Sequence, residues 1–156
     1  MPVEFVGGGF ESFTAALDRY RHNLDDLTPV WESLGKTLEE LHAEGFKAQR
    51  QAGTSNKWAA LSPEYKAWKD SVRPGRKILE FDGDLKDSLT KPGRGIRVYE
   101  PGKMVFGSDI PYAKYHMRPD GNRPARKPLI DAKKSRAFKT AVTARIQSFI
   151  VKGTVS

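Results

Sequence analysis

A chain of 156 residues without cysteine can build a single domain with one hydrophobic core, but it can form no disulfide, thiolate metal site or cysteine nucleophile. No apolar run approaches the roughly 20 residues that a membrane-spanning helix needs. The net charge of +8 is divided between an acidic helical part, residues 1–50 with a net charge of −4, and a basic part, residues 51–156 with +12. Charge alone favours a solvated basic surface over the alternative, an acidic partner such as nucleic acid or an acidic protein face.

The first segment of the chain predicts a short strand followed by a helix. Residues 2–6 suit an edge strand that ends at the glycines 7–9, and these glycines lack the Lys-Ser/Thr pair of a phosphate-binding loop. An apolar row at helical spacing then predicts a helix over residues 10–22. The row consists of Phe10, Phe13, Leu17 and Tyr20. No basic segment precedes an apolar run here, so we expect no secretory signal and use in a cytoplasm, or in a particle assembled there.

A long amphipathic helix is predicted over residues 29–46. Thr28 and Pro29 suit a helix start, because the hydroxyl can cap the first turn and proline has no amide hydrogen to leave unpaired there. A helix of this length needs a partner for its apolar face, either a sheet or another subunit, and a place in the core is the simpler interpretation. The apolar face comprises Val30, Trp31, Leu34, Leu38, Leu41 and Phe46.

Two shorter helices and a β-hairpin are predicted in the middle of the chain. One helix starts at Ser62 and carries Tyr65 and Trp68 near one face, and a brief helix follows the run 82–84, where an acidic residue would cap it. The hairpin joins the β-rich runs 95–100 and 103–107. Its turn is formed by Pro101 and Gly102, and proline followed by glycine suits a type II turn.

The last part of the chain predicts a loop and a final helix. Residues 110–116 suit a compact piece that packs against the hairpin, and residues 118–128 suit a loop rich in proline, arginine and lysine. Asp131 is expected to cap an amphipathic helix. The buried face of this helix would comprise Phe138, Val142, Ile146, Phe149 and Ile150. Helices at both ends around a small antiparallel sheet predict an α+β fold, with residues 1–156 as one domain.

The candidate catalytic and metal-binding residues have simpler explanations. His22, His42 and His116 lack a second histidine or a carboxylate at metal-ligand spacing, and the first two are expected near solvent. Asp82 and Asp84 beside Lys86 suggest a metal-dependent nuclease, but carboxylates at a helix start explain them more economically. Ser62 lacks the glycine-flanked elbow of a hydrolase nucleophile. We therefore expect no enzymatic activity, no metal and no cofactor.

A basic stretch with interleaved aromatic residues suggests an interaction surface. Arginines in such a stretch can contact phosphate oxygens, yet no helix-turn-helix, zinc-finger or RNA-binding signature accompanies them. Non-specific contact with DNA therefore stays an alternative, and sequence-specific binding is not expected. The stretch comprises Tyr112, Tyr115, Arg118, Arg123, Arg126 and Lys127.

Four islands of sequence stand out after residue 58 by their residue types, order and spacing. The first island runs from Trp58 to Tyr65 with Lys69, and the second contains residues 78–79, 82–85 and 88–89. The third covers residues 105–108, 110, 112–113 and 115–116, and the fourth is the arginine-proline run 123–129. In this order and spacing the islands together resemble the phage virion morphogenesis family, the tail-completion proteins of Mu-like phages. One departure follows His116, where the family continues with Gln and Gly and this chain has Met117 and Arg118.

The resemblance implies a structural protein of the tailed-phage virion that completes the tail or joins head and tail. Such a protein would form a homo-oligomeric ring around the DNA channel and contact neighbouring neck, connector or tail proteins. The virion neck would then be its location, after assembly in the host cytoplasm. The expected protein-interaction residues are Trp58, Tyr65, Tyr112, Tyr115, His116, Arg118, Arg123, Arg126 and Lys127.

The residues of the islands also allow a structural interpretation. Trp58, Tyr65 and Trp68 suit core or subunit contacts, and Gly83 and Gly107 suit turns or bulges where a side chain would clash. The long helix 29–46 and the hairpin would supply contacts between subunits. The loop 118–128 would meet a neighbouring protein, because its prolines limit the entropy lost on docking and its cations suit an acidic face.

Overall fold

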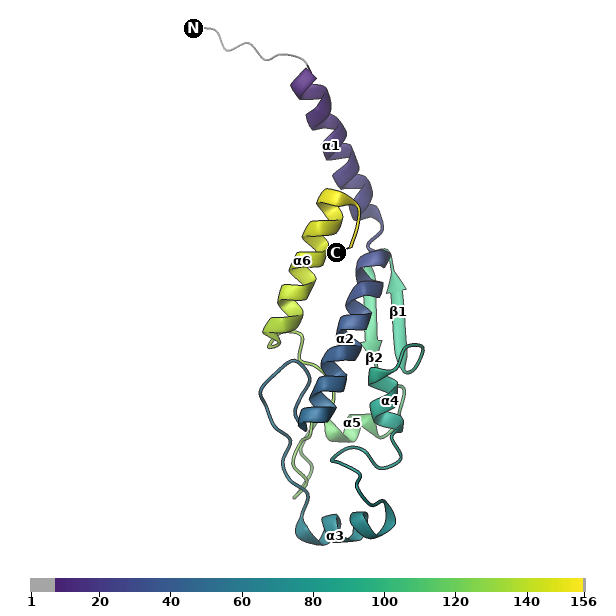
Figure 1. Cartoon of the computed structure of the whole chain (residues 1–156), viewed down its shortest axis with the longest axis vertical. Coiled ribbons are helices and arrows are strands. Elements are labelled where there is room, and N and C mark those ends of the chain that lie inside the picture. Colours follow the sequence, from purple (N-terminus) through teal and green to yellow (C-terminus); the bar gives the residue numbers. More distant parts are fainter. Residues whose placement is uncertain (1–7, 156) are drawn as a thin grey trace.

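A computed structural model describes residues 8–155 and has an elongated α+β fold (Figure 1). The strand predicted over residues 2–6 lies outside the described residues. The helix α1 lies at one end of the molecule and α3 at the other, with α2 along the axis between them. In chain order the elements are α1 (Gly8–Asp25), α2 (Thr28–Ala48), α3 (Pro63–Val72), α4 (Asp84–Thr90), β1 (Ile96–Glu100), β2 (Lys103–Gly107), α5 (Ala113–His116) and α6 (Arg136–Lys152).

The helix α2 is the central element of the fold. Its apolar face packs against α4, α6 and the hairpin of the same subunit, which confirms the core interpretation, while Trp31, Leu34 and Leu38 also line an open groove beside α6. The predicted hydroxyl cap is wrong. Thr28 is the first residue of the helix, and its N–H donates instead to the Asp26 carboxylate at 2.8 Å.

His42 lies in the core, which corrects its predicted position near solvent. Its Nδ1 is 2.6 Å from the carbonyl oxygen of Leu38, and its Nε2 accepts a hydrogen bond from the Ile130 N–H. The imidazole ring stacks on the Phe106 ring, with the two ring centroids 5.2 Å apart. The Arg97 guanidinium lies 3.8 Å from the Phe106 ring centroid. Arg97 in turn pairs with Glu39 at 3.1 Å. His42 and Glu39 of α2 therefore both contact residues of the hairpin.

The two strands form an antiparallel hairpin, in which Ile96 faces Gly107 and Glu100 faces Lys103. The predicted type II turn is wrong, because Gly102 does not have the positive φ that this turn requires. The Leu27 N–H donates to the Pro101 carbonyl at 3.1 Å and so fixes the orientation of the central peptide. Gly107 is also not a bulge, because it pairs with Ile96 in a continuous register, and a Cβ there would meet only a methyl of Ile96 at 3.9 Å.

The ends of α4 and α6 differ from prediction at their caps. The N-cap of α6 is Ser135, whose hydroxyl accepts a hydrogen bond from the Phe138 N–H at 3.2 Å; Asp131 accepts from the N–H groups of a preceding turn. Ser135 is fully buried, so packing decides between two residues that can both cap. The N-cap of α4 is Gly83, in the left-handed conformation, rather than an acidic residue.

The core consists of two clusters along the axis. One joins the C-terminal half of α2 to α4 and α5, and its buried residues are Phe46, Trp58, Leu85, Leu89 and Ala113. The other joins the start of α2 to α6, and its buried residues are Val30, Leu34 and Phe149. The predicted face of α6 is thus confirmed where it meets α2, with Phe138, Val142 and Ile146 packed around this second cluster.

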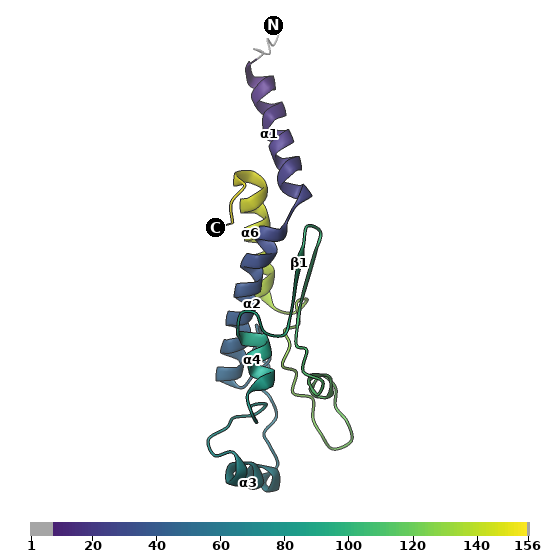
Figure 2. The same cartoon turned by 90° about the vertical axis from the view of Figure 1, so that its right-hand side faces the viewer.

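The helix α1 is longer than the predicted 10–22 and extends beyond the rest of the molecule (Figure 2). It contacts α6, and the Asn23 amide donates to the carbonyl oxygens of Phe149 and Ile150 at 3.1 and 3.0 Å. None of the helices that the structure describes is long and apolar enough to cross a membrane.

Candidate protein-interaction site

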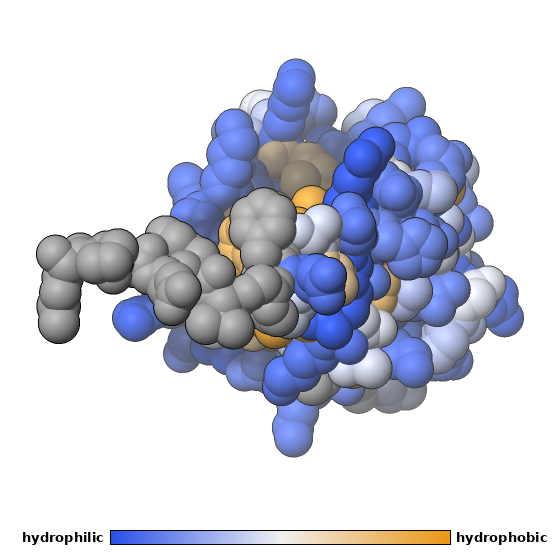
Figure 3. All heavy atoms as spheres, turned by 90° about the horizontal axis from the view of Figure 1, so that it is seen from above, coloured by the Kyte–Doolittle hydropathy of each residue, from blue (hydrophilic) through white to orange (hydrophobic). Residues whose placement is uncertain are grey.

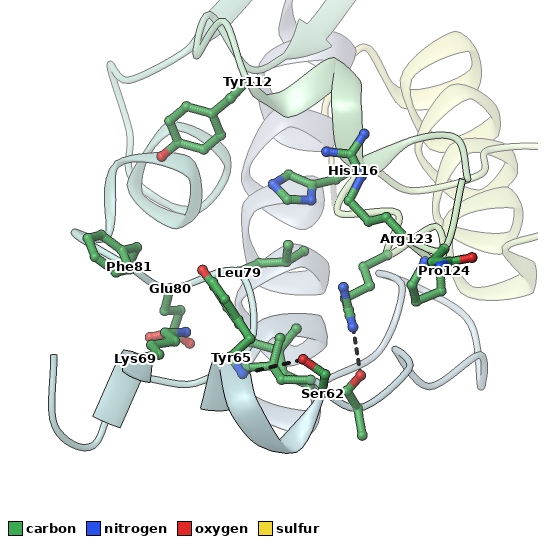
Figure 4. A pocket seen from close by; sticks show the side chains of 15 residues that line it. Ser62, Tyr65, Lys69, Leu79, Glu80, Phe81, Tyr112, His116, Arg123 and Pro124 are labelled. Atoms are coloured by element: carbon green, nitrogen blue, oxygen red, sulfur yellow. Dashed lines mark hydrogen bonds between the residues drawn. The ribbon is translucent and has the colours of Figure 1, made fainter. Parts of the chain in front are cut away.

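A cleft of about 770 Å³ lies between α3 and the segment that runs from α5 into the following loop (Figure 4). The segment 78–81 forms its third wall. Five of the nine predicted interaction residues belong to the cleft or its rim, although they come from segments about 50 residues apart. These five are Tyr65, Tyr112, His116, Arg123 and Arg126.

The α3 wall carries an exposed aromatic row. Ser62 caps the helix by accepting a hydrogen bond from the Tyr65 N–H at 3.3 Å, which confirms its predicted role. Tyr65 and Trp68, three residues apart, lie on the same face with ring centroids 5.4 Å apart, and Trp68 stacks on Phe81 at 5.8 Å. The side chains of Tyr65 and Trp68 are 45% and 51% exposed, so about half of this row's surface is left uncovered within the subunit.

Arg126 holds the opposite wall in place. Its guanidinium donates to the carbonyl oxygens of Ala59 and Ala60 at 2.7 and 2.6 Å, and the side chain is buried. Next to it, the Trp58 indole N–H donates to the Lys127 carbonyl at 2.9 Å. Trp58 is part of the core, so neither Trp58 nor the Arg126 guanidinium presents a free surface; the Lys127 side chain is exposed. These contacts fix the arginine-proline loop against the segment before α3.

Arg123 separates the cleft from a second, shallower hollow of about 450 Å³. It pairs with Asp120 at 3.2 Å, and its guanidinium lies 5.9 Å from the Tyr115 ring centroid. Its Nε is buried and has no hydrogen-bond partner in the described part of the chain. Exposed Tyr115 and Arg118 line this second hollow, so the remaining predicted residues lie next to the cleft rather than in it. Ala113 is the one residue of α5 in the buried core cluster, and Phe106 of β2 packs against the same cluster.

The charge of the cleft comes from its arginines. Burial lowers the pKa of His116, and Arg123 and Arg126 lower it further, so its imidazole is neutral at pH 7. Burial raises the pKa of Tyr112, which keeps its hydroxyl protonated. Glu80 is buried and paired with Lys86 at 3.2 Å. The cleft can therefore accept apolar groups, hydrogen-bonding groups and a carboxylate.

The carboxylates of the nuclease hypothesis have other partners. Asp82 pairs with Arg73 at 2.9 Å, Lys86 pairs with Glu80, and Asp84 lies in the first turn of α4. Within residues 8–155, no group of three or more histidine, aspartate or glutamate side chains could hold a metal ion.

Two features of the cleft were missed in the sequence. Lys69 is buried and donates to the Lys77 carbonyl, while burial lowers its pKa. Segment 78–81 forms a wall, and Leu79 has a left-handed backbone with a φ of 61°. Neither feature has a periodic or motif signal. The only hint was that both belong to islands of the family resemblance.

Comparison with known proteins agrees with that resemblance and extends it. No curated protein and no solved structure matches the chain. The profile of the phage virion morphogenesis family matches residues 9–145, so the match includes α1 and α2 as well as the islands after residue 58. Because this match covers most of the chain, the protein belongs to the phage virion morphogenesis family.

Proposed function

We propose that this protein is a structural subunit of a tailed-phage virion that completes the tail or joins it to the head, as part of a homo-oligomeric ring in the neck. The observation that carries the proposal is membership of the virion morphogenesis family over residues 9–145. The elongated shape also supports it. An interaction cleft lies beside α3 at one end of the subunit, and α1 lies at the other end. A subunit of this shape can contact different neighbours at its two ends.

The partner of the cleft would be an acidic or carboxylate-terminated segment of a neighbouring neck or tail protein that also carries an apolar side chain. The aromatic row of Tyr65 and Trp68 offers exposed apolar area of the kind that dominates protein interfaces. Arg123 at the rim and exposed Arg118 next to it offer positive charge, which favours an acidic partner.

The ring would close through heterologous contacts, in which one patch of each copy meets a different patch of the next. The apolar face of α2 packs mainly inside the subunit, so a ring contact through the predicted helix 29–46 would use the part of this face that lines an open groove beside the hairpin and α6. The loop 118–128 keeps its proposed role at a neighbouring protein, but through Arg118 and Arg123 rather than the enclosed Arg126.

The test is to locate the protein in purified particles and to change the cleft. Immunogold labelling should find it at the junction of head and tail, and the double variant Y65S/R123E should give heads and tails that fail to join. The matched control is R94E, a charge reversal at an exposed arginine in the loop between α4 and β1. Labelling that is absent from the particle, or normal joining by Y65S/R123E, would overturn the proposal.

Non-specific nucleic-acid binding is the rival function, supported by Lys114 and Arg123 near the exposed Tyr115 ring. It predicts affinity for short duplexes that falls steeply between low and moderate salt, because bound phosphates release counterions. If R118E/R123E abolishes such binding while labelling fails to find the protein at the junction, this rival replaces the proposal.

A further inference from the structure

The helix α1 leaves an apolar row uncovered. Phe13, Leu17 and Leu24 are 58%, 48% and 51% exposed, although they follow one another at helical spacing on one side of the helix. The contact with α6 uses a neighbouring side, where Asn23 bonds to the α6 backbone and Ala16 and Tyr20 are half-buried. An 18-residue helix that extends from the molecule is marginally stable without a partner for such a row.

An apolar groove of about 630 Å³ lies elsewhere on the same subunit, between α2, the hairpin and the first half of α6. Its walls include Trp31, Leu34, Met104, Phe106, Phe138 and Val142. The indole N–H of Trp31 is buried there and has no hydrogen-bond partner among the described residues. A buried donor without a partner is unfavourable, so this wall favours an incoming acceptor.

The subunit's own α1 does not fill this groove. It is anchored beside Phe149 and Ile150, in the last turns of α6, whereas the groove uses Phe138 and Val142 from the first turns. From that anchor α1 runs away from the molecule (Figures 1 and 2). Seen from above the view of Figure 1, the surface is mostly hydrophilic, with a few apolar residues exposed near the centre (Figure 3). A second copy of the chain can supply an α1 helix to this groove.

The charges beside the two surfaces are complementary. Glu11, Asp18 and Asp25 recur every seven residues and form an acidic row along α1. The edge of the groove formed by the start of α6 is basic, with Lys133, Lys134, Arg136 and Lys139 all exposed. None of these seven side chains takes part in an ion pair among residues 11–155. The acidic row of α1 and the basic edge at the start of α6 belong to the acidic N-terminal part and the basic C-terminal part of the sequence, respectively.

We propose that α1 of one copy docks into the groove between α2, the hairpin and α6 of the next copy. The apolar row would enter the groove, and the acidic row would face the basic edge at the start of α6. Because the two patches differ, the contact is heterologous and can propagate around a ring. The inference thus rests on the proposed ring and names the surfaces that would build it.

The chain contains no cysteine, so single cysteines can report the contact by disulfide cross-linking. Chains carrying L17C and chains carrying V142C are mixed as purified protein at high concentration, and the same pair is co-expressed during particle assembly. The expected product is a mixed dimer of the two chains. The matched control is A15C, which places the cysteine about half a turn away from Leu17 on the exposed opposite side of α1 and should not cross-link to V142C.

Charge reversal tests the same contact without changing the groove's apolar walls. D18K should lower the L17C–V142C cross-link yield by about tenfold, and K133E/K139E in the other chain should do the same. Combining D18K in one chain with K133E/K139E in the other should restore the yield to within about twofold of the original. Thermal unfolding of each single chain checks that it is folded.

Two results would overturn the inference. L17C cross-linking to L17C would mean that the apolar rows pair with each other, and no cross-link in either preparation would mean that the contact does not exist. Its failure is distinguishable from failure of the proposed function. Labelling at the junction of head and tail without the cross-link rejects only this interface, whereas the cross-link in a protein found outside the particle rejects only the neck assignment.

Discussion

His42 Nε2 accepts a hydrogen bond of 3.2 Å from the backbone N–H of Ile130, a residue 88 positions further along the chain. Because the Ile130 N–H can only donate, Nε2 must be unprotonated. The proton of the neutral ring therefore lies on Nδ1, which faces the Leu38 carbonyl oxygen at 2.6 Å. One buried imidazole therefore joins α2 to the segment that leads into α6. A second proton on the ring would break this link.

Stability should fall as pH falls from about 6.5 towards 4 because of His42. Burial lowers the pKa of His42 to about 4, whereas an unfolded chain has a histidine pKa near 6.5. The unfolded state then binds the proton more readily, so the free energy of unfolding decreases by about 3 kcal/mol across this window. Urea unfolding between pH 4 and pH 8 measures the slope, which H42Q should flatten.

The control is H22Q, which replaces an exposed histidine of α1 and keeps the hydrogen bond between His42 and Ile130. Part of the slope should survive in H42Q, since burial also lowers the pKa of His116. A slope in H42Q equal to that of the original protein would contradict the assignment.

At Gly95, carbonyl oxygens of the backbone leave no room for a side chain. Its φ is +65°, and an added Cβ would lie 2.6 Å from the Gly107 carbonyl oxygen and closer still to that of Ser88. Neither atom can move without disturbing β2 or α4, so G95A should lower the free energy of unfolding by about 3 kcal/mol or more. Gly93 supplies the matched control, because its φ of +71° is similar and nothing lies within 4 Å of its Cβ position.

G93A should therefore lower the free energy of unfolding by only about 1 kcal/mol, the penalty for a left-handed alanine. Equal losses in the two variants, measured by urea unfolding, would mean that backbone conformation rather than close packing explains the glycine at 95.

Periodicity predicted α2, the hairpin strands and the buried face of α6, because these elements bury a regular apolar pattern. It could not decide between Asp131 and Ser135 as the cap of α6. Both are capping residue types, and the choice depends on Ser135 being packed against Gly53, where an added Cβ would collide with its hydroxyl. That contact joins residues more than 80 positions apart, which no local pattern encodes.

The candidate site was predictable to a similar degree. Aromatic and arginine clusters pointed to residues that the structure gathers in one cleft, but sequence could not separate the arginines that contact a partner from those that hold the fold. Arg123 and Arg126 belong to the same run, yet only the Arg126 guanidinium donates hydrogen bonds to the carbonyl oxygens of residues 59 and 60. Its role depends on long-range packing.

Replacing Arg126 should therefore affect stability before it affects binding. R126L removes two charged donors and leaves the carbonyl oxygens of Ala59 and Ala60 without them, so we expect the free energy of unfolding to fall by about 3 kcal/mol. K127L changes the exposed neighbouring cation, whose side chain has no such contacts, and should change it by less than about 0.5 kcal/mol. Urea unfolding compares them, and similar losses would contradict this role of Arg126.

The exposed aromatic row of α3 should affect particle joining more than folding. Tyr65 and Trp68 are about half exposed, so Y65S/W68S loses the burial of only about half of each ring and should lower the free energy of unfolding by about 2 to 3 kcal/mol. If the row is the contact for a neighbouring virion protein, the same variant should reduce joined particles by at least about tenfold, because exposed tyrosine and tryptophan dominate interface energies. Electron microscopy counts the joined particles.

V151S is the control, since Val151 is 50% exposed near the C-terminal end of α6, at a distance from α3 along the molecule. It removes a comparably exposed apolar group and should leave the number of joined particles within about twofold of the original. Equal defects in the two variants would indicate a general effect of apolar surface on assembly. A large defect in Y65S/W68S alone, with the variant still folded, would place the contact at the aromatic row of α3.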